Sequence, residues 1–199
     1  MINNRKSIIV GIKTTKLTIK EVNFLKKYRP WGIILFSRNI VSIKQTKKLT
    51  DHIKAIFKDK NYPILIDEEG GRVSRLNKII DTSIFTPKYF GDLYVKNSKK
   101  FEIYFATYVK QICYILNLLG ININTVPVLD VIRSFSSKVL TDRCYSSNHK
   151  TVSYIGDQCI KIFKKYGIAT VIKHIPGHGL SKSDSHIDLP KIKTGLKKL

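Results

Sequence analysis

Residues 64–71 read ILIDEEGG, and this stretch decides the fold expected for the chain. Its first three residues are large and apolar, which is typical of a strand buried on both faces in a parallel sheet. Three carboxylates follow at once, and Gly70 and Gly71 permit a backbone turn that other residues resist. The pattern predicts a buried strand, Ile64–Asp67, whose carboxyl end carries polar side chains.

Four other short apolar runs share this pattern and alternate with helical segments. The expected strands are Ser7–Ile12, Gly32–Phe36, Ile121–Val126 and Ala169–Lys173. Capping-box patterns open the first two expected helices, at Thr18 with Glu21 and at Ser42 with Gln45, and glycines at 120 and 167 end the last two. The expected helices run from Thr18 to about Tyr28, from Ser42 to about Phe57, from about Ser98 to Leu119 and from about Lys150 to Tyr166.

Two architectures fit this alternation, a doubly wound sheet and a (β/α)8 barrel. No G-x-G-x-x-G sequence follows the first strand, which weakens a dinucleotide-binding fold. Polar residues follow four strands, at Ser37–Asn39, Asp67–Glu69, Asp130 and Lys173–His174, and this end of a TIM barrel builds the active site. A complete barrel takes roughly 250 residues. We therefore expect an α/β fold, a TIM-like (β/α)8 barrel truncated to about its first five β/α units, as one incomplete domain over residues 1–199.

The cysteines and the apolar segments indicate the cellular compartment of the protein. Three cysteines, odd in number and widely spaced, form neither a disulfide framework nor a metal-type pair, so a reducing compartment is expected. The apolar run Ile8–Ile12 is too short for a signal-peptide core. The segment 101–119 has the length of a membrane span, but Glu102 and Lys110 favour a buried helix. We expect a cytoplasmic protein without a membrane span.

The formal charge of +22 comes from 36 basic and 14 acidic residues. Nucleic-acid binding is one interpretation, and compositional drift toward lysine is the other. The lysines are spread along the whole chain without a nucleic-acid motif, so no specific nucleic-acid partner is expected. Arginines are few, yet four fall in candidate site loops, where a planar donor fork differs from a lysine point charge. These are Arg38, Arg72, Arg75 and Arg143.

Residues 173–190, KHIPGHGLSKSDSHIDLP, hold three of the five histidines. Asp184 lies two positions before His186, close enough for its carboxylate to orient and charge-stabilise the imidazole for proton transfer. A surface loop that merely contains histidines is the alternative. A metal site built from His174, His178, Asp184 and His186 is another, but the adjoining Lys173 opposes a cation, so no metal is expected.

The segment 66–76, IDEEGGRVSRL, is the second candidate site. Asp67 offers two oxygens to paired hydroxyl groups, and Arg75 offers a donor fork. A salt-bridged turn formed by Glu68, Glu69 and Arg72 remains the alternative.

Five stretches together resemble the consecutive motifs of glycoside hydrolase family 3, in its order and over nearly the whole chain. The similarity is greatest to the branch of single-domain bacterial β-N-acetylglucosaminidases that recycle cell wall. The segment KHIPGHG followed by DSH is the most specific, because the β-glucosidase branch lacks the Asp-Ser-His. The stretches are GIILFSRN (32–39), IDEEGGRVSRL (66–76), VPVLDV (126–131), DRCYSSN (142–148) and KHIPGHG…DSH (173–186).

The resemblance implies the roles of particular residues. Asp67, Arg75, Arg143, Lys173 and His174 would hold the sugar. His186 would be the general acid/base and Asp184 its dyad partner, in a retaining mechanism that passes through a glycosyl-aspartate.

The family's nucleophilic aspartate lies in an F-S-D-D-like motif, and no such motif follows His186 in these 199 residues. We therefore expect little turnover from this chain by itself, and a remnant that at most binds sugar is the alternative function. Glu68 stands where the family usually has glutamine. Phosphorolysis in place of hydrolysis stays open.

The resemblance also implies the substrate and the partners. The substrate class would be N-acetylglucosaminyl-anhydromuropeptides, from which terminal β-linked N-acetylglucosamine is removed. No cofactor is expected, and the protein would be a monomer if the barrel is complete.

Overall fold

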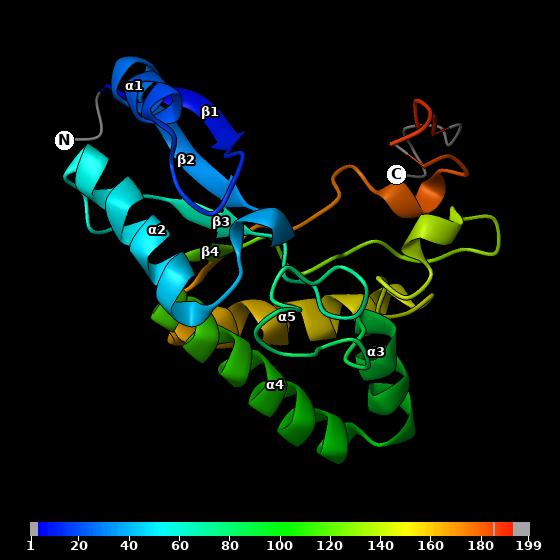
Figure 1. The fold of residues 1–199 in the computed structure, drawn as a ribbon. Coiled ribbons are helices and arrows are strands. Elements are labelled where there is room, and N and C mark those ends of the chain that lie inside the picture. The colour runs from blue at the N-terminus through cyan, green and yellow to red at the C-terminus, as the bar shows by residue number, and fades with distance from the viewer. Residues whose placement is uncertain (1–3, 185, 193–199) are drawn as a thin grey trace.

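The computed structural model describes residues 4–184 and 186–192, in which five strands form one parallel sheet in the order β1-β2-β3-β4-β5 (Figure 1). The strands are β1 (Lys6–Gly11), β2 (Pro30–Leu35), β3 (Ile64–Ile66), β4 (Ile123–Asn124) and β5 (Ala169–Thr170). The helices are α1 (Ile19–Tyr28), α2 (Ile43–Phe57), α3 (Pro87–Lys96), α4 (Ser98–Leu119) and α5 (His149–Lys165), with short 3₁₀ turns η1 (Ser37–Asn39), η2 (Lys138–Leu140) and η3 (His178–Leu180).

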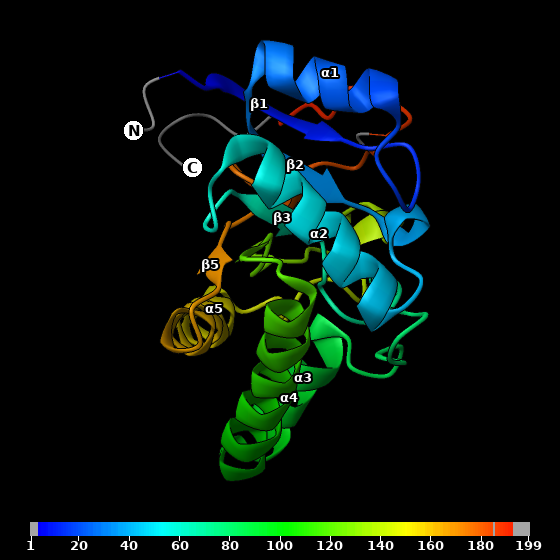
Figure 2. The ribbon, with the colours of Figure 1, turned by 60° about the vertical axis from the view of Figure 1, so that its left-hand side comes forward.

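The strand order determines where the helices lie. Right-handed crossovers between strands that advance in one direction place every connecting helix on the same face of the sheet. Accordingly α1 packs on α2, α2 on α4, and α4 on α5, and Figure 2 shows α1, α2 and α4 following one another along the sheet. The expected order and parallel direction are confirmed. The described residues form a singly wound sheet with open edges at β1 and β5, and they do not include a closed barrel.

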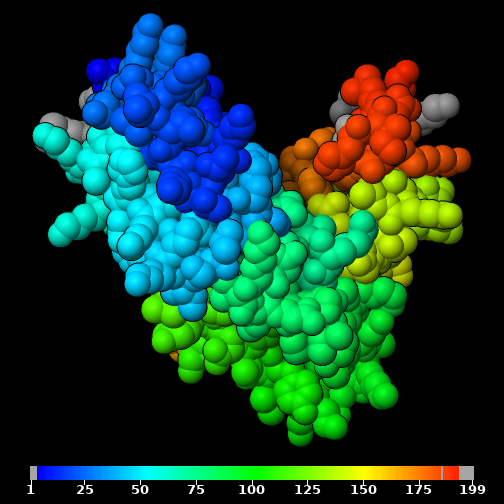
Figure 3. Space-filling model, viewed as in Figure 1, coloured from blue at the N-terminus to red at the C-terminus, as the bar shows by residue number. Residues whose placement is uncertain are grey.

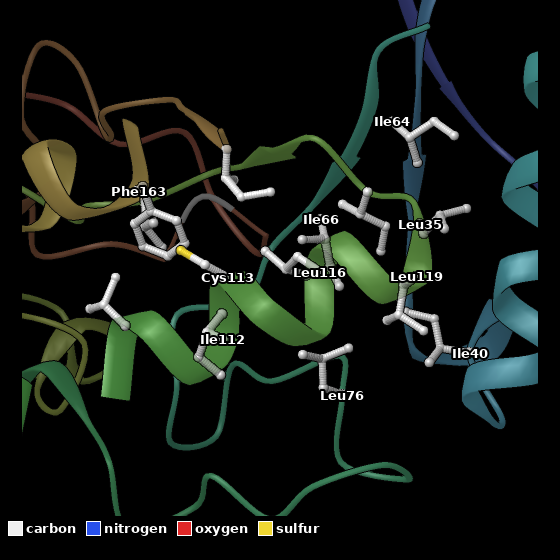
Figure 4. Close-up of a cluster of buried hydrophobic side chains, with 14 of the residues drawn as sticks. Leu35, Ile40, Ile64, Ile66, Leu76, Ile112, Cys113, Leu116, Leu119 and Phe163 are labelled. Atoms are coloured by element: carbon white, nitrogen blue, oxygen red, sulfur yellow. The ribbon is translucent and has the colours of Figure 1, made fainter. Parts of the chain in front are cut away.

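The core lies between this sheet and α4. Side chains of α4 at three- and four-residue spacing are buried, which is the pattern of a helix with one apolar face. Figure 4 shows Cys113 of α4 beside Phe163 of α5, Leu116 close to Ile66 of β3, and Leu119 on the side of Leu35 of β2. The opposite face of α4 is exposed, so the expected buried helix is in fact half-buried. Within the described residues, no helix has the length and apolarity needed to cross a membrane.

The helix ends follow local sequence signals. Thr18 and Glu21 form the expected capping box of α1, and Gly120 ends α4 in the left-handed region at φ 73°. The second expected box is only half formed. Ser42 accepts a hydrogen bond from the Gln45 N–H, but the Gln45 side chain accepts from the N–H of Val41 instead of Ser42.

One helix, α3, was not expected. Thr86 caps it and Pro87 occupies its first turn, which are ordinary helix-start signals. Gly91 lies in its middle, directly against the backbone of Tyr145. The helix therefore packs on the loop that carries Arg143.

The strands β4 and β5 are shorter than expected because the Val126 N–H turns back to the Asn124 carbonyl at 2.9 Å instead of pairing with β5, and Pro127 follows with no N–H to donate. Pairing resumes just beyond it, where Val128 bridges Lys173 and the Leu129 N–H donates to the Lys173 carbonyl at 2.7 Å. This second contact places Asp130 beside His174.

Candidate active site

The candidate site lies where the carboxyl ends of the strands meet. Asp67 follows β3, Asp130 lies beyond β4, Arg143 follows η2, and Lys173 and His174 lie beyond β5. Figure 3 shows an open hollow between the blue N-terminal region and the orange-red segment near the C-terminus, and the arrowheads of β1 and β2 in Figure 1 point toward it. Parallel strands bring their carboxyl ends to one edge, so residues distant in sequence converge there.

Asp67 forms the centre of this cluster. Its Oδ1 lies 3.3 Å from Lys173 Nζ, its Oδ2 lies 3.6 Å from Arg75 Nη2, and it accepts a hydrogen bond from the Thr125 hydroxyl. Burial alone acts to raise the pKa of Asp67, but Lys173, Thr125 and Arg75 outweigh it and hold the pKa below its ordinary value. The carboxylate is therefore an anion between two cations.

Glu69 pairs with Arg143 and with the same Lys173. Arg143 donates from Nε and Nη2 to its two oxygens at 2.8 and 2.9 Å, and Lys173 Nζ lies 2.6 Å from Oε1. The Glu69 side chain is 1% exposed. Burial acts to raise its pKa, and the hydrogen bonds and charges of Arg143 and Lys173 lower it below the ordinary value. Glu69 was not among the residues expected to hold the sugar, and a salt-bridged turn was the alternative for it.

His174 lies between a carboxylate and an arginine. Its Nδ1 is 2.6 Å from Asp130 Oδ2, and its Nε2 is 3.4 Å from Arg143 Nη2. The side chain of Asp130 is fully buried, whereas the His174 ring is about one-third exposed. Asp130 was noted in the sequence only as a polar residue that follows a strand, and no pattern there named His174 as its partner.

The five expected sugar-holding residues therefore lie together, linked through Glu69. Asp67 contacts Arg75 and Lys173, Lys173 contacts Glu69, Glu69 contacts Arg143, and Arg143 reaches His174.

The other two arginines of the candidate loops lie outside the cluster. Arg38 donates to the Ile12 carbonyl, and Arg72 pairs with Asp142 at 2.7 Å. The alternative interpretation, a salt-bridged turn of Glu68, Glu69 and Arg72, is wrong, because Arg72 does not pair with either glutamate in the described residues.

Glu68 lies beneath the cluster and has no cationic partner among the described residues. Its Oε2 accepts hydrogen bonds from the Ser74 hydroxyl and from the N–H groups of Arg75 and Leu76, at 2.7–3.1 Å. Its Oε1 lies 3.2 Å from the Thr82 hydroxyl. Burial raises the pKa of Glu68 above its ordinary value, although these hydrogen bonds oppose the rise. The residue supports the backbone of the loop that carries Arg75.

The expected dyad lies on the loop after η3. His186 Nδ1 is 2.8 Å from Asp184 Oδ1, and the His186 N–H donates to the same oxygen at 2.9 Å. Hydrogen bonds from the His186 backbone and ring lower the pKa of Asp184. The His186 side chain is 80% exposed, and no hydrogen bond among the described residues joins the dyad to the cluster. Ser185, between the two, lies outside the described residues.

The geometry gives little support to a metal centre. Within residues 4–184 and 186–192, no three His, Cys, Asp or Glu side chains are grouped so that they could hold an ion. The cations Lys173 and Arg143 already neutralise the buried carboxylate of Glu69. The arrangement is suited to an uncharged, hydroxyl-rich ligand that needs both donors and acceptors.

Comparisons with known proteins identify the family of the chain. Residues 6–199 match the model of the glycosyl hydrolase family 3 N-terminal domain. The chain is 33% identical to β-hexosaminidase A of Pseudoalteromonas piscicida, with 89% of this chain and 30% of that protein covered. It is 32% identical to a β-hexosaminidase of Alkalilimnicola ehrlichii, with 92% of this chain and 52% of that protein covered. The chain thus spans about half, or less, of these relatives.

The fold is also similar to that of solved structures. The crystal structure of NagZ from Neisseria gonorrhoeae in complex with N-trifluoroacetyl-D-glucosamine superposes with a TM-score of 0.88 at 29% identity. The match covers 98% of this chain and 57% of that one. Because the family model spans nearly every residue, the chain belongs to glycosyl hydrolase family 3 and comprises part of its N-terminal domain.

Proposed function

We propose that this chain is the sugar-holding part of a β-N-acetylhexosaminidase that removes terminal β-linked N-acetylglucosamine. The single observation that carries the proposal is the convergence of Asp67, Arg75, Arg143, Lys173 and His174 at the carboxyl ends of the strands. The similarity to a NagZ that binds N-trifluoroacetyl-D-glucosamine supports the choice of an N-acylated amino sugar.

Each residue of the cluster has a role in the proposed binding. Asp67 is held as an anion, so its oxygens accept hydrogen bonds from neighbouring sugar hydroxyls. Arg75, Arg143 and Lys173 are donors only, and they are suited to hydroxyl and acetamido oxygens. Ion pairs with Asp67 and Glu69 fix these cations before the sugar arrives, which reduces the entropy that binding costs.

The proposed chemistry divides between two groups. His186 donates a proton to the glycosidic oxygen as the bond to C1 breaks, and Asp184 stabilises the imidazolium beforehand. A carboxylate on the opposite face attacks C1 and forms a glycosyl ester. Water then displaces that carboxylate and returns a proton to His186, so the configuration at C1 is retained.

The attacking carboxylate must come from elsewhere, because His186 and Asp184 lie on one loop and reach only one face of the sugar. We propose that it belongs to a later strand of a TIM-like (β/α)8 barrel whose first five β/α units are described above. The proposed substrates are N-acetylglucosaminyl-anhydromuropeptides from peptidoglycan turnover in the cytoplasm. The completed barrel would act as a monomer without a cofactor.

The test is release of 4-nitrophenol from 4-nitrophenyl N-acetyl-β-glucosaminide. The 199-residue chain by itself is expected to give negligible turnover, since general acid catalysis alone contributes about 10²–10⁴-fold. A fusion that completes the barrel with the C-terminal part of the Alkalilimnicola ehrlichii relative is expected to turn over, and His186→Ala in that fusion is expected to abolish the activity. A folded but inactive fusion would refute the function. Turnover by the isolated chain that His186→Ala removes would refute the proposed source of the nucleophile.

A further inference from the structure

The buried carboxylate of Asp130 faces four nitrogen atoms, three backbone N–H groups and one ring nitrogen, all from the loop that begins at His174. Its Oδ2 lies 2.6 Å from the ring Nδ1 of His174 and 3.3 Å from the backbone nitrogen of the same residue. Its Oδ1 accepts from the backbone N–H groups of His178 and Gly179, at 2.5 and 3.2 Å. One side chain therefore fixes both the path of this loop and the orientation of the His174 ring.

The contact with Asp130 also determines which nitrogen of His174 carries the proton. A carboxylate accepts hydrogen bonds, so it favours a hydrogen on Nδ1. The other ring nitrogen, Nε2, faces Arg143 Nη2 at 3.4 Å. A guanidinium group only donates, so it needs a lone pair on Nε2. Both neighbours thus favour the same neutral tautomer, with hydrogen on Nδ1 and a lone pair on Nε2.

Arg143 cannot easily turn away from this arrangement, because Glu69 holds it through two hydrogen bonds. The result is a continuous row, Glu69–Arg143–His174–Asp130, with a buried carboxylate at each end. The only other titratable ring facing His174 among the described residues is that of His178, with centroids 5.8 Å apart. Burial acts to raise the pKa of Asp130, but the hydrogen bonds from His174, His178 and Gly179 keep it below the ordinary value, so the carboxylate stays charged.

We propose that Asp130 is a positioning residue, which holds His174 in the Nδ1–H tautomer so that Nε2 presents a lone pair to the sugar site. His174 would then accept a hydrogen bond from a sugar hydroxyl, beside cations that only donate. The tautomer itself follows from the described contacts, whereas the contact with sugar rests on the function proposed above. A carboxylate that sets the imidazole tautomer serves the same purpose in serine proteases.

The substitution Asp130→Asn separates this role from simple packing. An amide has one oxygen, but donors lie on both sides of the Asp130 side chain. If the oxygen stays with the two backbone N–H groups of His178 and Gly179, the NH₂ faces His174 Nδ1 and forces the hydrogen onto Nε2. That hydrogen would then point at Arg143, which also donates. The asparagine variant is therefore expected to invert the tautomer of His174.

The experiment is ¹⁵N NMR of histidine-labelled 199-residue chain, at a pH where the rings are neutral. In the wild type, His174 is expected to show a pyrrole-type Nδ1 and a pyridine-type Nε2, and Asp130→Asn is expected to exchange the two. The exposed-loop variant Asp81→Asn is the matched control and is expected to leave His174 unchanged. Titration with N-acetylglucosamine is expected to show binding at least about tenfold weaker in Asp130→Asn, which is about 1.4 kcal/mol.

The outcomes separate this inference from the proposed function. A wild-type His174 with hydrogen on Nε2 overturns the inference even if the sugar binds, and so does a folded Asp130→Asn that keeps the wild-type pattern. The expected tautomers without sugar binding in the wild type support the positioning role and refute the proposed function. If Asp130→Asn fails to fold, the wild-type spectrum alone still decides the tautomer.

Discussion

The Lys173 ammonium lies 2.6 Å from Glu69 Oε1, and this ion pair joins the loop after β3 to the end of β5. Both side chains are largely buried, with exposures of 14% and 1%. The same ammonium lies 3.3 Å from Asp67, so one cation balances two carboxylates. The site is thus assembled by long-range charge pairing, which has consequences for stability as well as for binding.

Glu69→Gln should destabilise the chain strongly. The substitution keeps the size of the side chain but removes the buried anion that Arg143 and Lys173 share. Removing one partner of a buried pair typically costs about 3–5 kcal/mol. The measurement is urea denaturation followed by circular dichroism.

The matched control for Glu69→Gln is Asp51→Asn in α2. It breaks the exposed pair of Asp51 with Lys47, which should cost no more than about 0.5 kcal/mol. Equal losses in the two variants would show that the buried pair does not hold the site together.

Glu68→Gln should have the opposite effect at neutral pH. Burial raises the pKa of Glu68 in the folded state, so the charged form is unfavourable there. A glutamine oxygen can accept from Ser74, Arg75 and Leu76, while its NH₂ donates to the Thr82 hydroxyl. The free energy of unfolding at pH 7 should therefore rise.

The gain from Glu68→Gln should depend on pH. Since the folded-state pKa of Glu68 lies above the unfolded value, wild-type stability increases as the pH falls through that interval. The difference between variant and wild type should shrink accordingly, as denaturation curves at several pH values would reveal. A variant less stable than wild type at pH 7 would contradict the account.

Acid should destabilise the folded chain by protonating the carboxylates of the site. Asp67, Glu69 and Asp130 all have folded-state pKa values below the ordinary ones. Their contribution to stability is complete above the unfolded values of about 4 and is lost as the pH falls through the lower folded values. Thermal unfolding of Glu68→Gln, which lacks the opposing titration, should show a plateau near neutrality and a steady decline below about pH 4. A decline that begins near pH 6 would point to histidines instead.

Gly91→Ala should disrupt the packing of α3 on the loop that carries Arg143. A Cβ at this position would overlap the carbonyl oxygen of Tyr145, and backbone cannot move aside as a flexible side chain does. Overpacking of this kind costs about 1–3 kcal/mol and sometimes more. Val95→Ala, at an exposed position of the same helix, is the control and should change stability by less than about 0.5 kcal/mol. If urea denaturation gave Gly91→Ala and Val95→Ala the same stability, the close packing of Gly91 on Tyr145 would be refuted.

Much of the fold could be predicted because its signals are local. The Thr18 capping box, the Ser42 cap and Gly120 each act within a few residues, and the structure has α1, α2 and α4 where these signals place them. Strand ends were less predictable, since they depend on pairing partners and on Pro127. Helix α3 was not predicted, although Thr86 and Pro87 are helix-start signals.

The site could be predicted only in part, for a related reason. Asp67, Lys173 and His174 lie at the carboxyl ends of expected strands, so topology alone brings them together. The partners of Glu69 and Asp130 are set by contacts between distant segments. Nothing in the local sequence distinguishes Glu69 from Glu68, yet the first pairs with two cations and the second with none in the described residues.

The proposed function requires that the cluster of Asp67, Arg75, Arg143, Lys173 and His174 bind N-acetylglucosamine. Its most direct test is calorimetric titration of this sugar into the folded 199-residue chain, into Arg143→Lys and into the distant control Arg29→Lys. Saturable binding is expected for the wild type and for Arg29→Lys. A lysine keeps the charge but loses the donor fork, so binding at least about tenfold weaker, about 1.4 kcal/mol, is expected in Arg143→Lys. No saturable binding by the folded wild type, or equal binding by Arg143→Lys, would refute the proposed sugar site.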